Sequence, residues 1–178
     1  MKMSFLEKYL WAKKATMLNL DTDKGYAEFY KMAKESGLGT RWLAYYANAY
    51  EAAGESGLKA LTYRKKMPLK IREQALEKIN KYLSRKVPVH LRSEIGFLVK
   101  TKSNRITVFE KRPLFIDPSK SSCVAAFQVR YTDFDNRWHL CWMRKFHIWW
   151  PYIPDQPVYT IDDCIREVKE DIWGCFWG

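Results

Sequence analysis

The spacing of apolar residues changes from a helical period in the first half of the chain to a period of two in the second half. Residues 4–18 and 21–36 each carry an apolar stripe at three- and four-residue spacing, which predicts two amphipathic helices. Residues 40–53 predict a third helix, against which the first two pack. Residues 68–86 predict a fourth helix that begins at a proline and has one apolar face and one face rich in Lys and Arg.

Short runs rich in β-forming residues follow this helical half. Residues 95–100 and 105–110 flank a polar turn and predict one hairpin, and residues 124–131 and 137–143 predict a second. Apolar and polar residues alternate along the second pair, so one face of each strand is apolar. We therefore expect a four-stranded antiparallel sheet with one apolar face.

A last helix is predicted near the C-terminus. Thr160 and Asp163 have the spacing of a capping box and predict a helix over residues 160–172, placed to cover the apolar face of the sheet. The chain is thus predicted to be an α+β protein with two domains. Residues 1–67 form a helical bundle, and residues 68–178 form a domain of basic helix, four-stranded sheet and C-terminal helix.

The second hairpin also predicts a polar face on the sheet. Period-two alternation places basic residues opposite the apolar ones, namely Arg130, Arg137, His139 and Arg144. We expect this face to be open to water, as one face of an antiparallel sheet commonly is, with contact to phosphates as the alternative. The aromatic residues Trp149, Trp150 and Tyr152 are expected to close the core rather than to stack on bases.

The positive charge of the chain is concentrated in its middle. The 178 residues carry a net charge of +11, and residues 59–112 alone hold sixteen Lys and Arg against four Asp and Glu. Residues 151–178, in contrast, hold two basic and six acidic residues. Because net charge governs association rather than fold, this distribution indicates a polyanionic partner.

The composition suits a protein that folds in water. The chain is 47% hydrophobic and 16% aromatic, which is ample for a packed core. Charged residues interrupt the apolar runs, including residues 1–20, so we expect no transmembrane helix, no cleavable signal and a cytoplasmic location. The four cysteines lie far apart without C-x-x-C spacing, which predicts reduced thiols, no metal site and no cofactor.

Residues 29–50 have the features of two helices joined by a tight turn. Ala33 is the small residue needed where the helices cross, Gly37 permits a positive φ at the turn, and Leu43 is spaced to return to the core. The segment resembles the helix-turn-helix motif of repressors and transposases. The resemblance continues for about forty residues through a Gly-spaced element and a basic run to Pro68, as in transposases.

This resemblance implies a DNA interface. The outer, N-terminal half of the recognition helix would reach base edges in the major groove, and the basic run would contact phosphates. A plain three-helix bundle with a solvated face is the alternative. The implied DNA-binding residues are Thr40, Arg41, Tyr45, Arg64, Lys65 and Lys66.

A second resemblance covers about half the chain, from about residue 94 to residue 178. Its elements are a hairpin ending at residues 105–113, a second hairpin at residues 129–149, and a closing helix followed by the aromatic segment 171–178. In this order they resemble an uncharacterised prokaryotic family known only as a domain of unknown function. The resemblance implies a fold for this half of the chain and no activity.

The acidic residues form no recognisable catalytic pattern. Asp133 and Asp135 lie in a predicted hairpin turn, and Asp162 and Asp163 lie at a helix start, where they favour the helix dipole. A metal-dependent nuclease needs carboxylates gathered on one scaffold, and no such group is evident. We therefore expect a protein that binds duplex DNA, transposon-related or regulatory in role, rather than an enzyme.

Two other classes of function stay open on the sequence alone. Residues 59–112 would also suit a protein-interaction module that binds an acidic partner. A metal-dependent nuclease is the third class. We expect the sheet domain to provide a contact for self-association or for a protein partner, and we expect no membrane contact.

Overall fold

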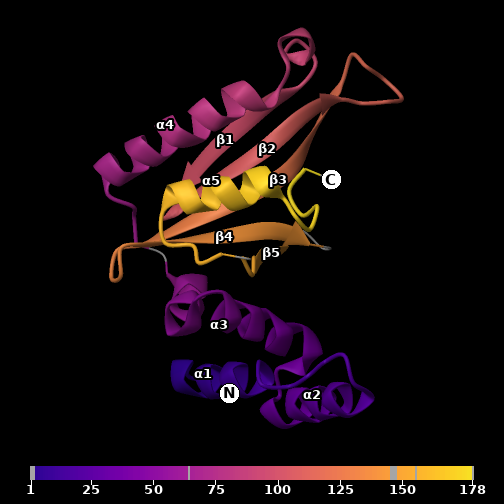
Figure 1. The fold of residues 1–178 in the computed structure, drawn as a ribbon, viewed down its shortest axis with the longest axis vertical. Coiled ribbons are helices and arrows are strands. Elements are labelled where there is room, and N and C mark those ends of the chain that lie inside the picture. The colour runs from indigo at the N-terminus through magenta and orange to yellow at the C-terminus, as the bar shows by residue number, and fades with distance from the viewer. Residues whose placement is uncertain (1–2, 64, 145–147, 155, 178) are drawn as a thin grey trace. The chain divides into compact units, whose positions relative to one another are not determined.

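The computed structural model of the chain describes residues 3–63, 65–144, 148–154 and 156–177. The chain divides into two compact units (Figure 1). The first unit comprises Met1–Thr62 and Trp150–Pro154, and the second comprises Tyr63–Trp149 and Asp155–Gly178.

The first unit contains three helices, α1 (Phe5–Ala15), α2 (Asp23–Ser36) and α3 (Gly39–Thr62). They share a core in which Ala33 and Leu43 are buried, as the sequence predicts. The turn between α2 and α3 is short because Gly37 ends α2 in the left-handed region, with φ of 67°. The three helices predicted for this half are therefore confirmed.

Helix α3 is longer than the predicted helix over residues 40–53 and contains a break. Ala53 and Gly54 leave the helical conformation, with Gly54 at φ 57° and ψ −139°, and the chain then resumes a helix to Thr62. After the break, Gly57 packs against the backbone carbonyl of Ala49 so closely that a Cβ on Gly57 would lie 1.8 Å from the oxygen. Helix α3 thus consists of two helical segments, and the predicted end of the first near residue 53 is confirmed.

The chain has a five-stranded antiparallel sheet in the order β1-β2-β3-β4-β5, of which β1 to β4 and the first residues of β5 belong to the second unit. Its strands are β1 (Gly96–Lys102), β2 (Arg105–Pro113), β3 (Ser121–Thr132), β4 (Arg137–Arg144) and β5 (Ile148–Pro151). The predicted number of four strands is wrong. Strand β5 was hidden in a segment punctuated by prolines, and an edge strand tolerates proline because one side of it needs no ladder hydrogen bonds.

Two helices cover one face of this sheet, α4 (Leu69–Lys86) and α5 (Ile161–Glu170) (Figure 1). They bury residues on the sides facing the sheet, among them Ile79 of α4 and Val168 of α5. The sheet contributes buried residues such as Val108 and Phe127 to the same core. The predicted cover by the C-terminal helix is confirmed, and its predicted capping box forms at Thr160.

One side chain organises the end of the chain after α5. The carboxylate of Asp171 accepts hydrogen bonds from the backbone N–H groups of Cys175 at 2.7 Å, Phe176 at 3.2 Å and Trp177 at 3.0 Å. The indole N–H of Trp177 donates to the carbonyl of Val168 at 2.9 Å. The turn after α5 therefore returns the aromatic residues to the core, where Phe176 is buried.

The connection between β2 and β3 leaves large apolar side chains in water. Phe115 is 101% exposed and Ile116 is 95% exposed, and their neighbour Leu114 is 39% exposed. Most large apolar residues of a folded protein gain stability by burial, so these side chains contribute almost nothing to the core.

Candidate nucleic-acid interface

The exposed side of α4 carries a row of cations. Lys70, Lys78, Lys81 and Arg85 lie eight, three and four residues apart, which places them on one side of a helix, and all four residues are exposed. The opposite side of α4 supplies buried apolar residues such as Ile79 to the core. Helix α4 is therefore fixed on the sheet with its cations in water.

Part of this row lines a cavity of about 580 Å³ between α4 and α5. Its two uncharged lining residues are Tyr82 and Ile165, which we call its floor, and Asp162 contributes the one carboxylate among the residues that line it. Five cations line the same cavity: Lys78, Lys81, Arg85, Lys86 and Lys169. Hereafter we call this site the α4–α5 cleft.

The electrostatics of the α4–α5 cleft favour an anion. Lys78 pairs with Asp162 across the cleft, which uses its only carboxylate. Burial raises the pKa of Tyr82 to about 12, so the phenol stays neutral at physiological pH and adds no negative charge. The other four cations lie close together, and no further lining carboxylate balances their charge. A bound polyanion would reduce the repulsion between them.

The predicted recognition-helix residues lie in the first unit, near the start of α3. Arg41 is exposed and Thr40 is half-buried. Tyr45 is also half-buried and packs against the core cluster of the three helices, with its ring 5.5 Å from that of Trp42. Of the three residues, Arg41 is thus the one with an open path to a ligand.

The predicted phosphate contacts lie in the second unit. Lys65 and Lys66 are exposed, and Lys65 forms an ion pair with Asp133 at 2.5 Å. Arg64 lies outside the described residues. The predicted residues that the structure describes therefore divide between the two units, and none of those lines the α4–α5 cleft.

The predicted polar face is buried at Arg130 and His139, so the expectation that it is open to water is wrong there, whereas Arg144 is exposed. Arg130 is 4% exposed and His139 is 9% exposed. The Arg130 Nε–H donates to the Gln128 side chain at 2.9 Å, and the Gln128 amide donates to Thr107 at 2.9 Å. A buried polar group is costly unless it is hydrogen-bonded, and this face meets that need with a network of its own residues.

His139 lies in this buried network, with its Nε2 3.1 Å from the hydroxyl oxygen of Thr132. Burial, together with the nearby charges of Arg137 and Arg130, lowers the pKa of His139 from 6.5 to about 4, although Asp135 acts in the opposite direction. His139 is thus neutral in the folded protein at physiological pH.

Stability should therefore fall in mild acid. The unfolded chain protonates His139 near pH 6.5, whereas the folded chain resists protonation down to about pH 4, so the stabilisation is complete above pH 6.5 and is lost below it. At about pH 5 the expected loss is about 2 kcal/mol relative to neutral pH. Urea unfolding at both pH values measures it. His139→Gln should lack this part of the pH dependence, and an unchanged pH dependence in that variant would contradict the assignment.

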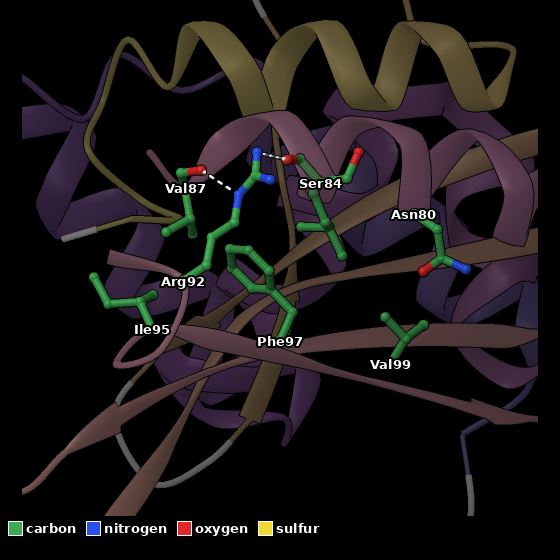
Figure 2. A pocket seen from close by; sticks show the side chains of 8 residues that line it. Asn80, Ser84, Val87, Arg92, Ile95, Phe97 and Val99 are labelled. Atoms are coloured by element: carbon green, nitrogen blue, oxygen red, sulfur yellow. Dashed lines mark hydrogen bonds between the residues drawn. The ribbon is translucent and has the colours of Figure 1, made fainter. Parts of the chain in front are cut away.

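A smaller cavity of about 250 Å³ lies between the end of α4 and β1 (Figure 2). Its lining is mixed, with apolar residues such as Phe97 and Val99 and the polar residues Asn80, Ser84 and Arg92. Figure 2 shows Arg92 reaching across its end, where the guanidinium donates to the carbonyls of Val87 at 3.2 Å and Ser84 at 2.9 Å. Arg92 thus caps the last carbonyls of α4, and its role here is structural.

Within the described ranges, no group of three or more His, Cys, Asp or Glu is placed to hold a metal ion. None of the helices in those ranges is both long enough and apolar enough to span a bilayer. The four cysteines form no disulfide, as predicted, and Trp150 and Tyr152 are buried, as expected for core residues.

The C-terminal resemblance seen in the sequence is confirmed by a match of residues 67–178 to the family described as Domain of unknown function (DUF3024). The chain belongs to the DUF3024 family. The DUF3024 match begins before residue 94, the start expected from the sequence, and so includes α4 together with the sheet and α5. Both walls of the α4–α5 cleft therefore belong to the DUF3024 domain.

The match leaves the preceding helices outside it, so the helix-turn-helix resemblance gains no support from this comparison. No curated protein and no solved structure matches the chain. The α4–α5 cleft went unnoticed in the sequence because its walls are about eighty residues apart. The available signal was the Lys- and Arg-rich face of the helix over residues 68–86.

Proposed function

We propose that this DUF3024 protein binds nucleic acid, and that the cations of α4 make the main contacts with phosphates. The observation that carries the proposal is the row Lys70, Lys78, Lys81 and Arg85, exposed on a helix that is anchored to the sheet. Phosphate contacts from Lys and Arg supply most of the affinity of such proteins, whatever the base sequence.

The distribution of charge between the units supports this choice of surface. Residues 1–62 hold nine Lys and Arg against seven Asp and Glu, which is +2 of the total net charge of +11. The excess therefore lies in the rest of the chain, which contains α4. The electrostatic part of binding belongs to the DUF3024 domain rather than to the N-terminal helices.

In this proposal the N-terminal helices recognise duplex DNA through a helix-turn-helix. The protein would then be transposon-related or regulatory. The tight turn at Gly37 and the exposed Arg41 on the first turns of α3 support it. Arg41 has the fork of donors that pairs with a guanine edge. Thr40 and Tyr45 are half-buried and would contribute less.

The test uses fluorescence anisotropy to measure the binding of labelled duplex and single-stranded DNA at two salt concentrations. Affinity should fall at least about tenfold between about 50 and 200 mM salt, because bound phosphates release their counterions. Lys81→Glu combined with Arg85→Glu should weaken binding about tenfold or more at low salt. Lys13→Glu combined with Lys14→Glu, the same charge change on two exposed residues of α1, is the matched control and should have little effect.

Other outcomes would overturn the proposal or its parts. Affinity that is independent of salt, or equal losses in the α4 double variant and in the α1 control, would overturn phosphate binding by α4. Selection from a random duplex library tests the recognition helix separately. If Arg41→Ala selects the same sequences as the wild type, the helix-turn-helix role fails. A defined complex with an acidic protein, without any binding of DNA, would favour the interaction-module alternative.

A further inference from the structure

We infer that the α4–α5 cleft binds a single-stranded segment of nucleic acid, with a base on the floor of the cleft and the neighbouring phosphates on its cationic rim. The inference rests on the proposed function and makes it more specific. Three properties of the cleft carry it: its size, the mixture of apolar and cationic walls, and the placement of cations on both of its sides.

The size of the cleft suits one nucleotide rather than a double helix. A cavity of about 580 Å³ lies in the range that encloses a small organic ligand. A duplex keeps its bases stacked and paired inside. Only its backbone could therefore contact a concave cleft. A single strand can turn an unstacked base outward into a pocket while its backbone follows the rim.

The floor of the cleft is suited to a base. Tyr82 and Ile165 line it with a phenol ring and an aliphatic side chain. Tyr82 also lies next to Trp177, with ring centroids 6.3 Å apart, so the tyrosine is supported from behind by a second ring. Aromatic side chains accept any base on their faces, which is the usual basis of binding to single strands without sequence preference.

The rim of the cleft is suited to phosphates on both sides of that base. Lys81 and Arg85 belong to the α4 wall, and Lys169 belongs to the α5 wall. Among the described residues, none of these three cations forms an ion pair with a carboxylate. Cations on opposite walls can hold successive phosphates of one strand, whereas a row on one helix alone would suit any polyanion.

The experiment compares a labelled oligo(dT) strand with a labelled hairpin duplex of equal length, both at low salt. Ile165→Trp fills the floor of the cleft without changing charge. It should weaken binding of oligo(dT) about tenfold and change binding of the duplex less than about twofold. Ile165→Val is the matched control and should leave both affinities unchanged. Circular dichroism melting establishes whether each variant is folded.

Lys169→Glu provides a second variant on an exposed residue, in case the larger side chain at Ile165 prevents folding. It should weaken oligo(dT) binding more than Lys70→Glu does, because Lys70 lies on α4 outside the cleft. If both probes bind the wild type but lose affinity equally in the cleft variants, or lose none, the cleft assignment is overturned and the proposed function stands. If neither probe binds the wild type, both are overturned.

Discussion

Gly57→Ala is expected to lower the free energy of unfolding of the N-terminal helices by about 4 kcal/mol. The added Cβ would lie 1.8 Å from the carbonyl oxygen of Ala49 and 2.9 Å from its carbonyl carbon. These are backbone atoms of a buried residue, so no flexible side chain can move aside to relieve the clash. Relief requires the segment after the break in α3 to separate from the segment before it.

Chemical unfolding followed by circular dichroism measures this loss. Gly96→Ala is the matched control because no atom lies within 4 Å of a Cβ built there, and its φ is not positive. We expect the control to change stability by less than about 1 kcal/mol. Equal stabilities for the two variants would show that α3 does not pack upon itself at Gly57.

Asp171→Ala is expected to cost about 3 kcal/mol and to release the aromatic end of the chain. The variant leaves the N–H groups of Cys175, Phe176 and Trp177 without their shared acceptor. Hydrogen bonds to a charged group are stronger than neutral ones, and several are lost together here. Without them, Trp177 should leave its position 6.0 Å from the ring of Phe127.

The measurement combines urea unfolding with tryptophan fluorescence, which should shift to longer wavelength as Trp177 becomes exposed. Asp171→Asn keeps one carbonyl oxygen as an acceptor and should lose less stability. Glu170→Ala removes a carboxylate from the adjacent, exposed position and serves as the control. A fluorescence spectrum that stays unchanged in Asp171→Ala would mean that packing alone holds the C-terminal segment.

The sequence predicts the helices of this protein well because each has an apolar stripe and a recognisable end. Gly37 is the clearest case, since it occupies the positive φ that a tight turn requires. Gly54, at φ 57°, likewise follows the end of a helical segment, and the chain then starts a second segment that buries Leu58 and Leu61. Local sequence identifies the glycine, whereas packing decides whether the helix resumes.

The surfaces were harder to predict than the elements. Alternation placed Arg130 and His139 on one face of the sheet, but the exposure of that face depends on how the chain packs around it. The α4–α5 cleft depends in the same way on which two helices become neighbours. The basic side of α4 could be predicted, whereas its partner Lys169 lies in an acidic stretch that shows no excess of positive charge.

The exposed loop between β2 and β3 affects how copies of the protein attract one another in solution but not how stably each copy folds. Phe115 and Ile116 are in water in the folded state just as they are in the unfolded chain, so they add nothing to the free energy of unfolding through burial. The same two side chains are nevertheless available to meet other molecules whenever the protein is concentrated. Colloidal attraction between copies should therefore depend on this loop, while the melting temperature does not.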